Sequence, residues 1–250
     1  MLANKSSKTV TFRVYRYTPE QKSAPKLVSY EVDTAKSGPM VIDGLNYIKE
    51  NLDPSLSFRK ACREGVCGSC AMNINGRNGL ACIQKIRDHG KVITVRPLPH
   101  FKVVRDLVVD MDRFFEHHAS VKPWLIRSDS ARHIDPKQRE LLQSQHERAV
   151  LDGLYECVLC GCCSGACPEY WWSEDSEGRF LGPSALQQAY RWVADSRDQG
   201  RAERLRSLKK DYHKIYNCHN IMNCSVACPK NLNPAKSVNK LRALVNQFDQ

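Results

Sequence analysis

The sequence predicts an α+β fold, with a small α+β domain over residues 1–100 and an all-helical domain over residues 101–250. Apolar and polar residues alternate along the first part of the chain, whereas apolar residues beyond Pro99 recur about every 3.6 positions. The twelve cysteines also divide along the chain, one group falling in the first part and two similar groups in the second. We therefore expect two domains that carry different sites.

The first domain begins with a predicted hairpin. Residues 10–17 and 27–32 alternate apolar and polar side chains, and prolines interrupt the segment between them. Apolar residues then recur at helical spacing over residues 41–52, as far as Asp53, which precedes a proline. This pattern predicts a helix that follows the hairpin.

Shorter elements complete the first domain. A strand is expected over residues 72–74, and the pairs Asn75-Gly76 and Asn78-Gly79 each predict a tight turn. A further strand is expected over residues 91–95. Strands that wrap one helix, with the first cysteine loop at an edge, make a small domain that ends near Pro99.

The second domain is expected to be helical throughout. Apolar residues from 103 to 115 lie on one helical face and predict a helix, which an irregular connector follows over residues 118–135. His117 and His118 are not part of any spacing that predicts a metal ligand or a catalytic partner, so we interpret them as surface residues. Further helices are expected in three segments, two of them with proline in the first turn: 136–151, 183–195 and 234–247.

The first cysteine group predicts a [2Fe–2S] site. Its members are spaced C-x4-C-x2-C with a distant fourth cysteine, which is the plant-type ferredoxin pattern. Gly65 and Gly68 lie within the loop, where glycine allows the backbone to turn its N–H groups toward sulfur. The predicted ligands are Cys62, Cys67, Cys70 and Cys82.

The other two groups predict a pair of clusters. Both follow the bacterial ferredoxin spacing C-x2-C-x2-C-x3-C-P, in which the fourth cysteine of each run ligates the cluster of the other run. This crossover assigns a [4Fe–4S] cluster to Cys157, Cys160, Cys163 and Cys228. The remaining set has Ile221 in place of a ligand, so we expect a [3Fe–4S] cluster on Cys167, Cys218 and Cys224. Cys162 is left over and is interpreted as a small buried hydrophobe.

Zinc sites and disulfides are the competing interpretations of the cysteines. The doubled run leaves seven cysteines, an awkward number for four-coordinate zinc sites. Residues 1–8 are polar and too short for a convincing signal or transit peptide, which argues for a reducing compartment and against disulfides. We expect a chain on the cytoplasmic face of a bacterial membrane, with the matrix side of the mitochondrial inner membrane as the alternative.

Composition excludes several other functions. The formal charge of +11 is cancelled by eleven ligating thiolates, and oxidised cluster cores would add back about +5 in total, which leaves roughly +5. The basic residues are also scattered, so a nucleic-acid partner is not expected. No apolar run approaches the ~20 residues that cross a bilayer, so membrane association should come through partner subunits. There is no nucleotide-binding fingerprint and no nucleophile–base motif. The chain is expected to carry electrons, with no catalytic residues of its own.

Aromatic residues directly follow Cys167. Trp171 and Trp172 come after Pro168, and such tryptophans are usually core residues, although an indole also suits a planar quinone because it combines an apolar body with an N–H donor. His219, beside Cys218, either caps a carbonyl or supplies a proton or charge near the same cluster. The residues alone slightly favour the structural role for His219.

These motifs resemble the iron–sulfur subunit family of succinate:quinone oxidoreductase, the respiratory complex II. The resemblance covers nearly the whole chain, including Cys62–Cys82, Leu154–Cys157, Cys167–Trp172, Ala189–Trp192 and Cys218–Cys224. It implies a β-grasp [2Fe–2S] ferredoxin domain followed by a bacterial-ferredoxin-like helical domain. It also implies electron flow from succinate, through the FAD of a separate flavoprotein subunit and the [2Fe–2S], [4Fe–4S] and [3Fe–4S] clusters, to a quinone beside membrane anchor subunits.

The same resemblance implies the residues of a quinone pocket. They are Pro168, Trp171, Trp172, His219 and Ile221, with the indole of Trp172 as a hydrogen-bond donor. Such a subunit would link the tricarboxylic acid cycle to the respiratory chain. Two alternatives stay open: a quinol:fumarate reductase subunit with the same fold and clusters, and a freestanding multi-cluster ferredoxin. The paired tryptophans favour the succinate-oxidising enzyme.

Overall fold

The structure is a computed structural model that describes residues 9–21, 24–127, 140–172, 180–211 and 213–248. The chain divides into two compact units. One unit comprises residues 1–111 together with 158–165, and the other comprises 112–157 together with 166–250. None of the helices in the described ranges is both long and apolar enough to cross a membrane.

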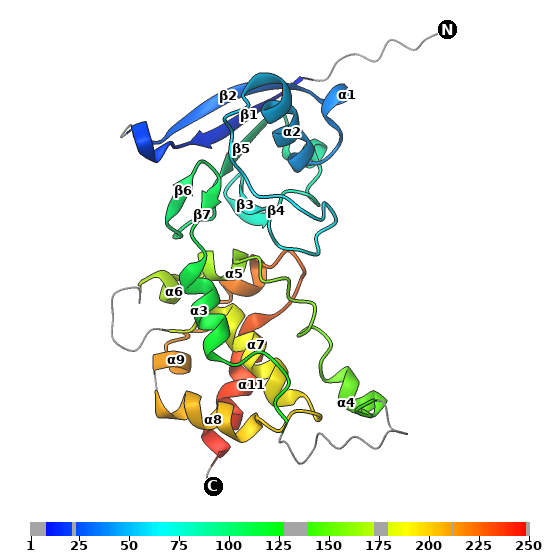
Figure 1. The fold of residues 1–250 in the computed structure, drawn as a ribbon, viewed down its shortest axis with the longest axis vertical. Coiled ribbons are helices and arrows are strands. Elements are labelled where there is room, and N and C mark those ends of the chain that lie inside the picture. Colours follow the sequence, from blue (N-terminus) through cyan, green and yellow to red (C-terminus); the bar gives the residue numbers. More distant parts are fainter. Residues whose placement is uncertain (1–8, 22–23, 128–139, 173–179, 212, 249–250) are drawn as a thin grey trace. The chain divides into compact units, whose positions relative to one another are not determined.

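The first unit is built on a five-stranded sheet with the order β2-β1-β5-β3-β4 (Figure 1). β1 and β2 pair in antiparallel register from Thr9–Asp33 to Arg16–Lys26, which confirms the predicted hairpin. β1 and β5 are parallel, and the other pairs are antiparallel. The strands are β1 (Thr9–Arg16), β2 (Lys26–Asp33), β3 (Ala71–Ile74), β4 (Arg77–Leu80) and β5 (Val92–Arg96).

One helix packs against this sheet, as predicted. α2 (Val41–Tyr47) continues into the π-helical turn η2 (Ile48–Leu52). The side chains of Leu45 and Phe12 are fully buried, and a Cβ atom at Gly44 would lie 2.3 Å from the Phe12 ring. The helix therefore lies close to β1. Short elements complete the unit: η1 (Pro19–Gln21), α1 (Thr34–Ser37), η3 (Ile86–His89) and α5 (Cys162–Gly165).

The helix predicted over residues 103–115 is wrong in its first part. β6 (Val103–Arg105) and β7 (Val108–Val109) form a small antiparallel hairpin, and helix begins only at α3 (Asp112–Ser120). The valines favour strands because they are β-branched. Asp106, at the turn, has a φ of 46° and is held there by hydrogen bonds from distant residues, which local periodicity does not reveal.

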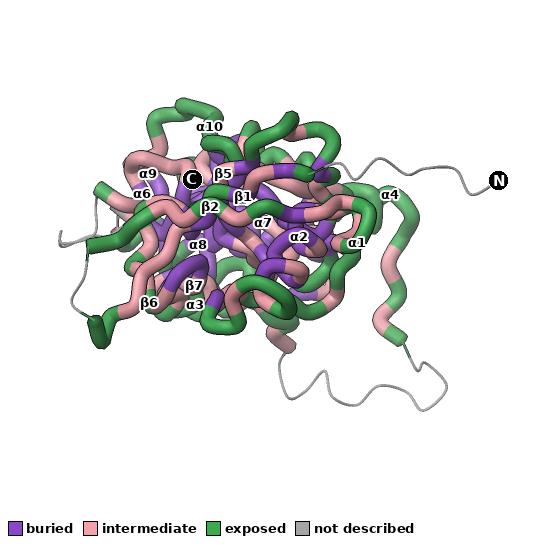
Figure 2. Tube along the Cα trace, turned by 90° about the horizontal axis from the view of Figure 1, so that it is seen from above, coloured by how far each residue is buried: buried purple, intermediate pink, exposed green. Residues whose placement is uncertain are grey.

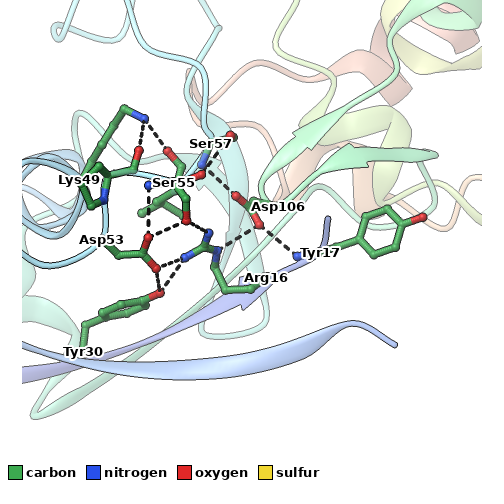
Figure 3. A network of polar contacts seen from close by, with 10 residues as sticks. Arg16, Tyr17, Tyr30, Lys49, Asp53, Ser55, Ser57 and Asp106 are labelled. Carbon is green, nitrogen blue, oxygen red and sulfur yellow. Dashed lines mark hydrogen bonds and ion pairs between the residues drawn. The ribbon is translucent and has the colours of Figure 1, made fainter. Parts of the chain in front are cut away.

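Figure 3 shows the polar network that holds this turn. Asp106 is only 1% exposed, and its carboxylate accepts the N–H groups of Tyr17 (2.9 Å) and Ser57 (2.8 Å). The guanidinium of Arg16, at the end of β1, donates to Asp106 (3.0 Å) and also pairs with Asp53. The network therefore joins the first hairpin, the end of η2 and the β6–β7 turn.

Only one of the two predicted Asn-Gly turns forms. Asn75-Gly76 makes the turn between β3 and β4, whereas Asn78 and Gly79 lie inside β4. Asn78 pairs with Asn73 across the hairpin, and a Cβ atom at Gly79 would lie 2.0 Å from the Gln84 amide. Gly79 thus serves close packing instead of a second turn.

The second unit is helical. Its largest helix pair is α7 (Gly182–Ala194) against α11 (Pro234–Gln247), and most residues of α7 are buried (Figure 2). Both helices carry proline in the first turn, as expected for two of the predicted helices. The remaining helices of the unit are α3, α4 (Gln145–Ala149), α6 (Pro168–Trp172), α8 (Arg201–Lys210), α9 (His213–Tyr216) and α10 (Asn223–Val226).

Two predictions for the second unit need correction. In the described part of the predicted helix 136–151, helix extends only over Gln145–Ala149, because Ser144 caps its start by accepting the N–H of Glu147; residues 136–139 lie outside the described ranges. His117 is not a surface residue: it is 8% exposed, and its Nδ1 lies 3.2 Å from the carbonyl oxygen of Leu181. His118 is half-buried, and burial lowers its pKa.

Candidate iron–sulfur cluster sites

The first cysteine loop points backbone amides at sulfur. The Sγ atom of Cys62 accepts three backbone N–H groups, from Glu64 (3.5 Å), Val66 (3.3 Å) and Cys67 (3.3 Å). These hydrogen bonds stabilise the thiolate and lower the pKa of Cys62 to about 6. The loop reaches this shape through positive φ angles at Arg63 (65°), Gly65 (75°) and Gly68 (73°).

Cys70 and Cys82, in contrast, are buried in the apolar core of the first unit. Burial raises the pKa of Cys70 to about 12, and the neighbouring sulfurs of Cys82 and Cys67 add to the rise. Both sulfurs are therefore close enough to Cys70 to disfavour its thiolate form. A thiol that coordinates a metal ion loses its proton. The positive charge of bound iron would then offset the repulsion between the neighbouring thiolates. The donor set fits the predicted [2Fe–2S] cluster.

The predicted [4Fe–4S] ligand set is divided between the two units. Cys160 and Cys163 lie in the segment that packs with the first unit, and Cys157 and Cys228 lie in the second. The assignment of these four residues to one [4Fe–4S] cluster stays a prediction. Cys162 is fully buried in an apolar cluster with Leu98 and Val109, which confirms its interpretation as a small buried residue.

The three cysteines of the third predicted set all belong to the second unit. Burial raises the pKa of Cys167 to about 11, and the sulfurs of Cys224 and Cys218 raise it further. Cys224 is 8% exposed, and burial raises its pKa as well. Ile221, in the ligand position of the pattern, is 54% exposed and offers no donor atom. This donor set fits a cluster bound by three thiolates.

The described residues contain no group of three or more His, Cys, Asp or Glu residues arranged to hold a metal ion. The cluster assignments therefore depend on the cysteine spacing, on the backbone N–H groups that donate to Cys62, and on the effect of neighbouring sulfurs on the pKa values of Cys70 and Cys167.

Arg242 is a site residue that the sequence did not suggest. From α11, its guanidinium donates to the carbonyl oxygens of Ile215 (3.1 Å), Tyr216 (2.7 Å) and Cys218 (2.6 Å). It thereby fixes the backbone of a predicted ligand and places a positive charge beside it. The sequence feature that could have indicated this role is that an arginine directly follows Leu241, a buried residue on the apolar face of α11.

The predicted quinone residues lie in the two segments that directly follow Cys167 and Cys218. Pro168 begins α6, and the rings of Trp171 and Trp172 lie edge to face at its end, with centroids 5.0 Å apart. Trp172 is 72% exposed, so it is not a core residue. The Nε2 atom of His219 lies 3.7 Å from the carboxylate of Glu169, a contact that spacing did not predict.

Comparison with known proteins agrees with these features. A family model described as a 2Fe-2S iron-sulfur cluster binding domain matches residues 11–116. A second model, described as a 4Fe-4S dicluster domain, matches residues 153–232. The two models contain the first cysteine group and the doubled run respectively.

A relative from Dictyostelium discoideum, the mitochondrial succinate dehydrogenase [ubiquinone] iron-sulfur subunit, is 51% identical over 97% of this chain and 85% of its own length. The chain belongs to the succinate dehydrogenase iron–sulfur subunit family. Another family member, subunit 1 from Oryza sativa subsp. japonica, is 51% identical over 94% of this chain and 82% of its own length. A chain of the Mycobacterium smegmatis Sdh1 complex in the apo form has the same fold, with a TM-score of 0.83, 24% identity and 98% coverage of both chains.

Proposed function

We propose that this subunit transfers electrons one at a time from the FAD of a flavoprotein subunit, through [2Fe–2S], [4Fe–4S] and [3Fe–4S] clusters, to a quinone. When bound, the clusters supply one-electron carriers. Family membership and the two matching cluster-domain models support the proposal. The observation that carries its last step is that Trp172 and Ile221 are exposed in the segments that follow the predicted ligands Cys167 and Cys218, so an electron acceptor can approach there.

The residues around that set supply what a quinone requires. Trp172 offers an exposed indole N–H as a donor to a quinone carbonyl, and the faces of Trp171 and Trp172 offer apolar contact to its ring. Pro168 and Ile221 supply further apolar surface, and His219 has the carboxylate of Glu169 as its partner. The pocket is completed by partner subunits in this proposal.

The proposed partners follow from the same arrangement. The flavoprotein subunit holds the FAD, because this chain has no nucleotide-binding motif. Anchor subunits hold the chain at the membrane, on the cytoplasmic face in a bacterium or the matrix side in a mitochondrion. Exposed apolar side chains near the third cysteine set are suited to such a contact.

Isolation from native membranes tests the proposal. We expect a flavoprotein and membrane-spanning subunits to co-purify with the chain, and succinate to reduce quinone in the purified complex. Electron paramagnetic resonance (EPR) of the oxidised complex should show a [3Fe–4S] signal. A chain that purifies alone, or that shows only four-iron and two-iron clusters, would contradict the proposed function.

A further inference from the structure

The segment Val158–Gly165, which carries two predicted [4Fe–4S] ligands, packs within the same compact unit as the [2Fe–2S] loop. Val158 and Cys160 pack against the core cluster that contains Cys70 and Cys82. Cys162 is fully buried in a second apolar cluster of the same unit. The segment is therefore held to the rest of the first unit by buried contacts, although residues 112–157 separate the two parts along the chain.

Gly68 permits the closest of these contacts. It directly follows the predicted ligand Cys67 and has a φ of 73°. A Cβ atom at Gly68 would lie 2.3 Å from the carbonyl oxygen of Val158 and 3.1 Å from the Cα atom of Cys160. Both obstructing atoms belong to backbone, which cannot move aside as a flexible side chain does. Any other residue at this position would push the two ligand segments apart.

Asn78 holds the same segment from a second direction. Its Nδ2 group donates to the carbonyl oxygen of Cys162 (3.1 Å). Its Oδ1 atom accepts from the side chain of Asn73 (2.8 Å), which fixes the orientation of the amide. Near the end of the segment, a Cβ atom at Gly165 would lie 3.0 Å from the carbonyl oxygen of Pro99. Close backbone contact is thus repeated along the segment.

We propose that Gly68 and Asn78 are positioning residues that set the separation between the [2Fe–2S] and [4Fe–4S] clusters. The inference rests on the proposed function. The step that it concerns is the transfer of one electron, which oxidises the first cluster and reduces the second. The four predicted [2Fe–2S] ligands and two of the four predicted [4Fe–4S] ligands, Cys160 and Cys163, belong to one compact unit, so the separation of these two ligand segments depends on packing inside that unit. The ligands of the third cluster all belong to the other unit.

The test compares Gly68→Ala with Gly76→Ala in the intact complex. Gly76 has a similar φ of 84°, but a Cβ atom there would meet nothing within 4 Å, so it reports the cost of backbone strain alone. The main measurement is the magnetic coupling between the reduced [2Fe–2S] and [4Fe–4S] clusters, read from the microwave power that saturates the [2Fe–2S] EPR signal. We expect Gly68→Ala to lose part of this coupling and to slow succinate-driven reduction of the [4Fe–4S] cluster, whereas Gly76→Ala retains both.

Asn78→Asp provides a second variant of nearly unchanged size that sits outside the cysteine loop. It replaces the N–H donor to Cys162 by a carboxylate oxygen, and we expect the same loss of coupling with an unchanged [2Fe–2S] spectrum. Coupling equal to that of the wild type in both variants, with all clusters loaded, would overturn the inference and leave the proposed function intact. A wild-type complex without [2Fe–2S] and [4Fe–4S] signals would instead overturn the proposed function.

Discussion

At the scale of single residues, the predicted ligand sulfurs differ in how readily they ionise. Backbone N–H groups lower the pKa of Cys62 to about 6, whereas burial raises the pKa of Cys70 to about 12 and that of Cys167 to about 11. Of these three, Cys62 is the one that exists mainly as a thiolate at neutral pH, and the thiolate is the form that binds metal. We infer that iron binding must displace protons from Cys70 and Cys167.

Ile221 is expected to decide the type of the third cluster. We expect Ile221→Cys to complete the C-x2-C-x2-C-x3-C pattern and to allow a fourth iron to bind. The oxidised complex should then lose its [3Fe–4S] EPR signal. Ile221→Val, which adds no donor atom, is the control. An unchanged [3Fe–4S] signal in Ile221→Cys would show that position 221 does not face the open corner of the cluster.

Trp172 is expected to bind quinone through its indole N–H. Trp172→Phe keeps an aromatic ring but removes the donor, and the loss of one hydrogen bond should raise the KM for quinone by about 3- to 10-fold. Steady-state kinetics with succinate and quinone measure this change. Trp124→Phe, at a tryptophan that is 51% exposed elsewhere in the same unit, is the matched control. Equal KM values in the two variants would leave Trp172 only a packing role.

Arg242 is expected to tune the third cluster. Its positive charge lies beside the backbone of Cys218, so Arg242→Gln should make reduction less favourable and lower the cluster potential. A redox titration followed by EPR measures the shift. Arg242→Lys retains the charge and should retain most of the potential. Lys236→Gln removes an exposed charge from the same helix, and a similar shift in that variant would rule out a local effect of Arg242.

At the scale of elements, the Arg16 network connects the first hairpin with the end of η2 and with the β6–β7 turn. Figure 3 shows Asp53 receiving hydrogen bonds from Tyr30, Ser55 and Arg16. Burial alone would raise the pKa of Asp53, but these hydrogen bonds outweigh it and hold the pKa below its usual range. The ionised carboxylate therefore stabilises the connection between η2 and the first hairpin.

The pH dependence of stability follows from this shift. Because the pKa of Asp53 is lower in the folded chain, its contribution is present above the unfolded pKa of about 3.9 and is lost as the pH falls through the folded value. At pH 7 we expect Asp53→Asn to lower the free energy of unfolding by about 1–3 kcal/mol. Chemical denaturation across pH should show this difference shrinking below about pH 4.

An exposed carboxylate provides the control for Asp53. Asp88 pairs with Arg87 at 3.7 Å, and the Asp88 side chain is 62% exposed. Asp88→Asn should change stability by less than about 0.5 kcal/mol at any pH, because exposed pairs contribute little. A pH-independent difference between wild type and Asp53→Asn would contradict the assignment of the effect to the Asp53 carboxylate.

At the scale of the whole molecule, the chain leaves apolar side chains exposed near its third cysteine set. The side chains and their exposed fractions are Ile221 (54%), Met222 (41%), Trp172 (72%) and Val226 (87%). Exposed apolar groups that gather near a predicted site are typical of a surface that a partner covers. Contact with the proposed anchor subunits would account for the exposure of these apolar side chains.

Val226 tests that surface at a position that is neither a predicted ligand nor a predicted quinone residue. A charge buried in a subunit contact without a partner is costly, so Val226→Glu should weaken retention of the complex on membranes. Sedimentation of membranes after a salt wash measures the retained fraction. Leu142→Glu is the matched control, since Leu142 is 81% exposed in the same unit but outside this cluster of apolar side chains. Equal retention of both variants would place the anchor contact elsewhere.

Local patterns in the sequence were sufficient for the three cysteine groups, the gap at Ile221, the first hairpin and the helix over Pro234–Gln247. Ligand spacing and the periods of strand and helix are properties of consecutive residues. They require no knowledge of what the segment packs against.

Only the tertiary structure decided how distant residues act on these groups. It showed that Val158–Gly165 packs with the first unit, that Gly68 and Asn78 hold it there, and that Arg242 contacts the backbone of Cys218. It also showed that residues 103–109 form a hairpin where a helix was expected. These outcomes depend on burial, close backbone approach and hydrogen bonds between residues far apart in the chain, and no local period encodes such contacts.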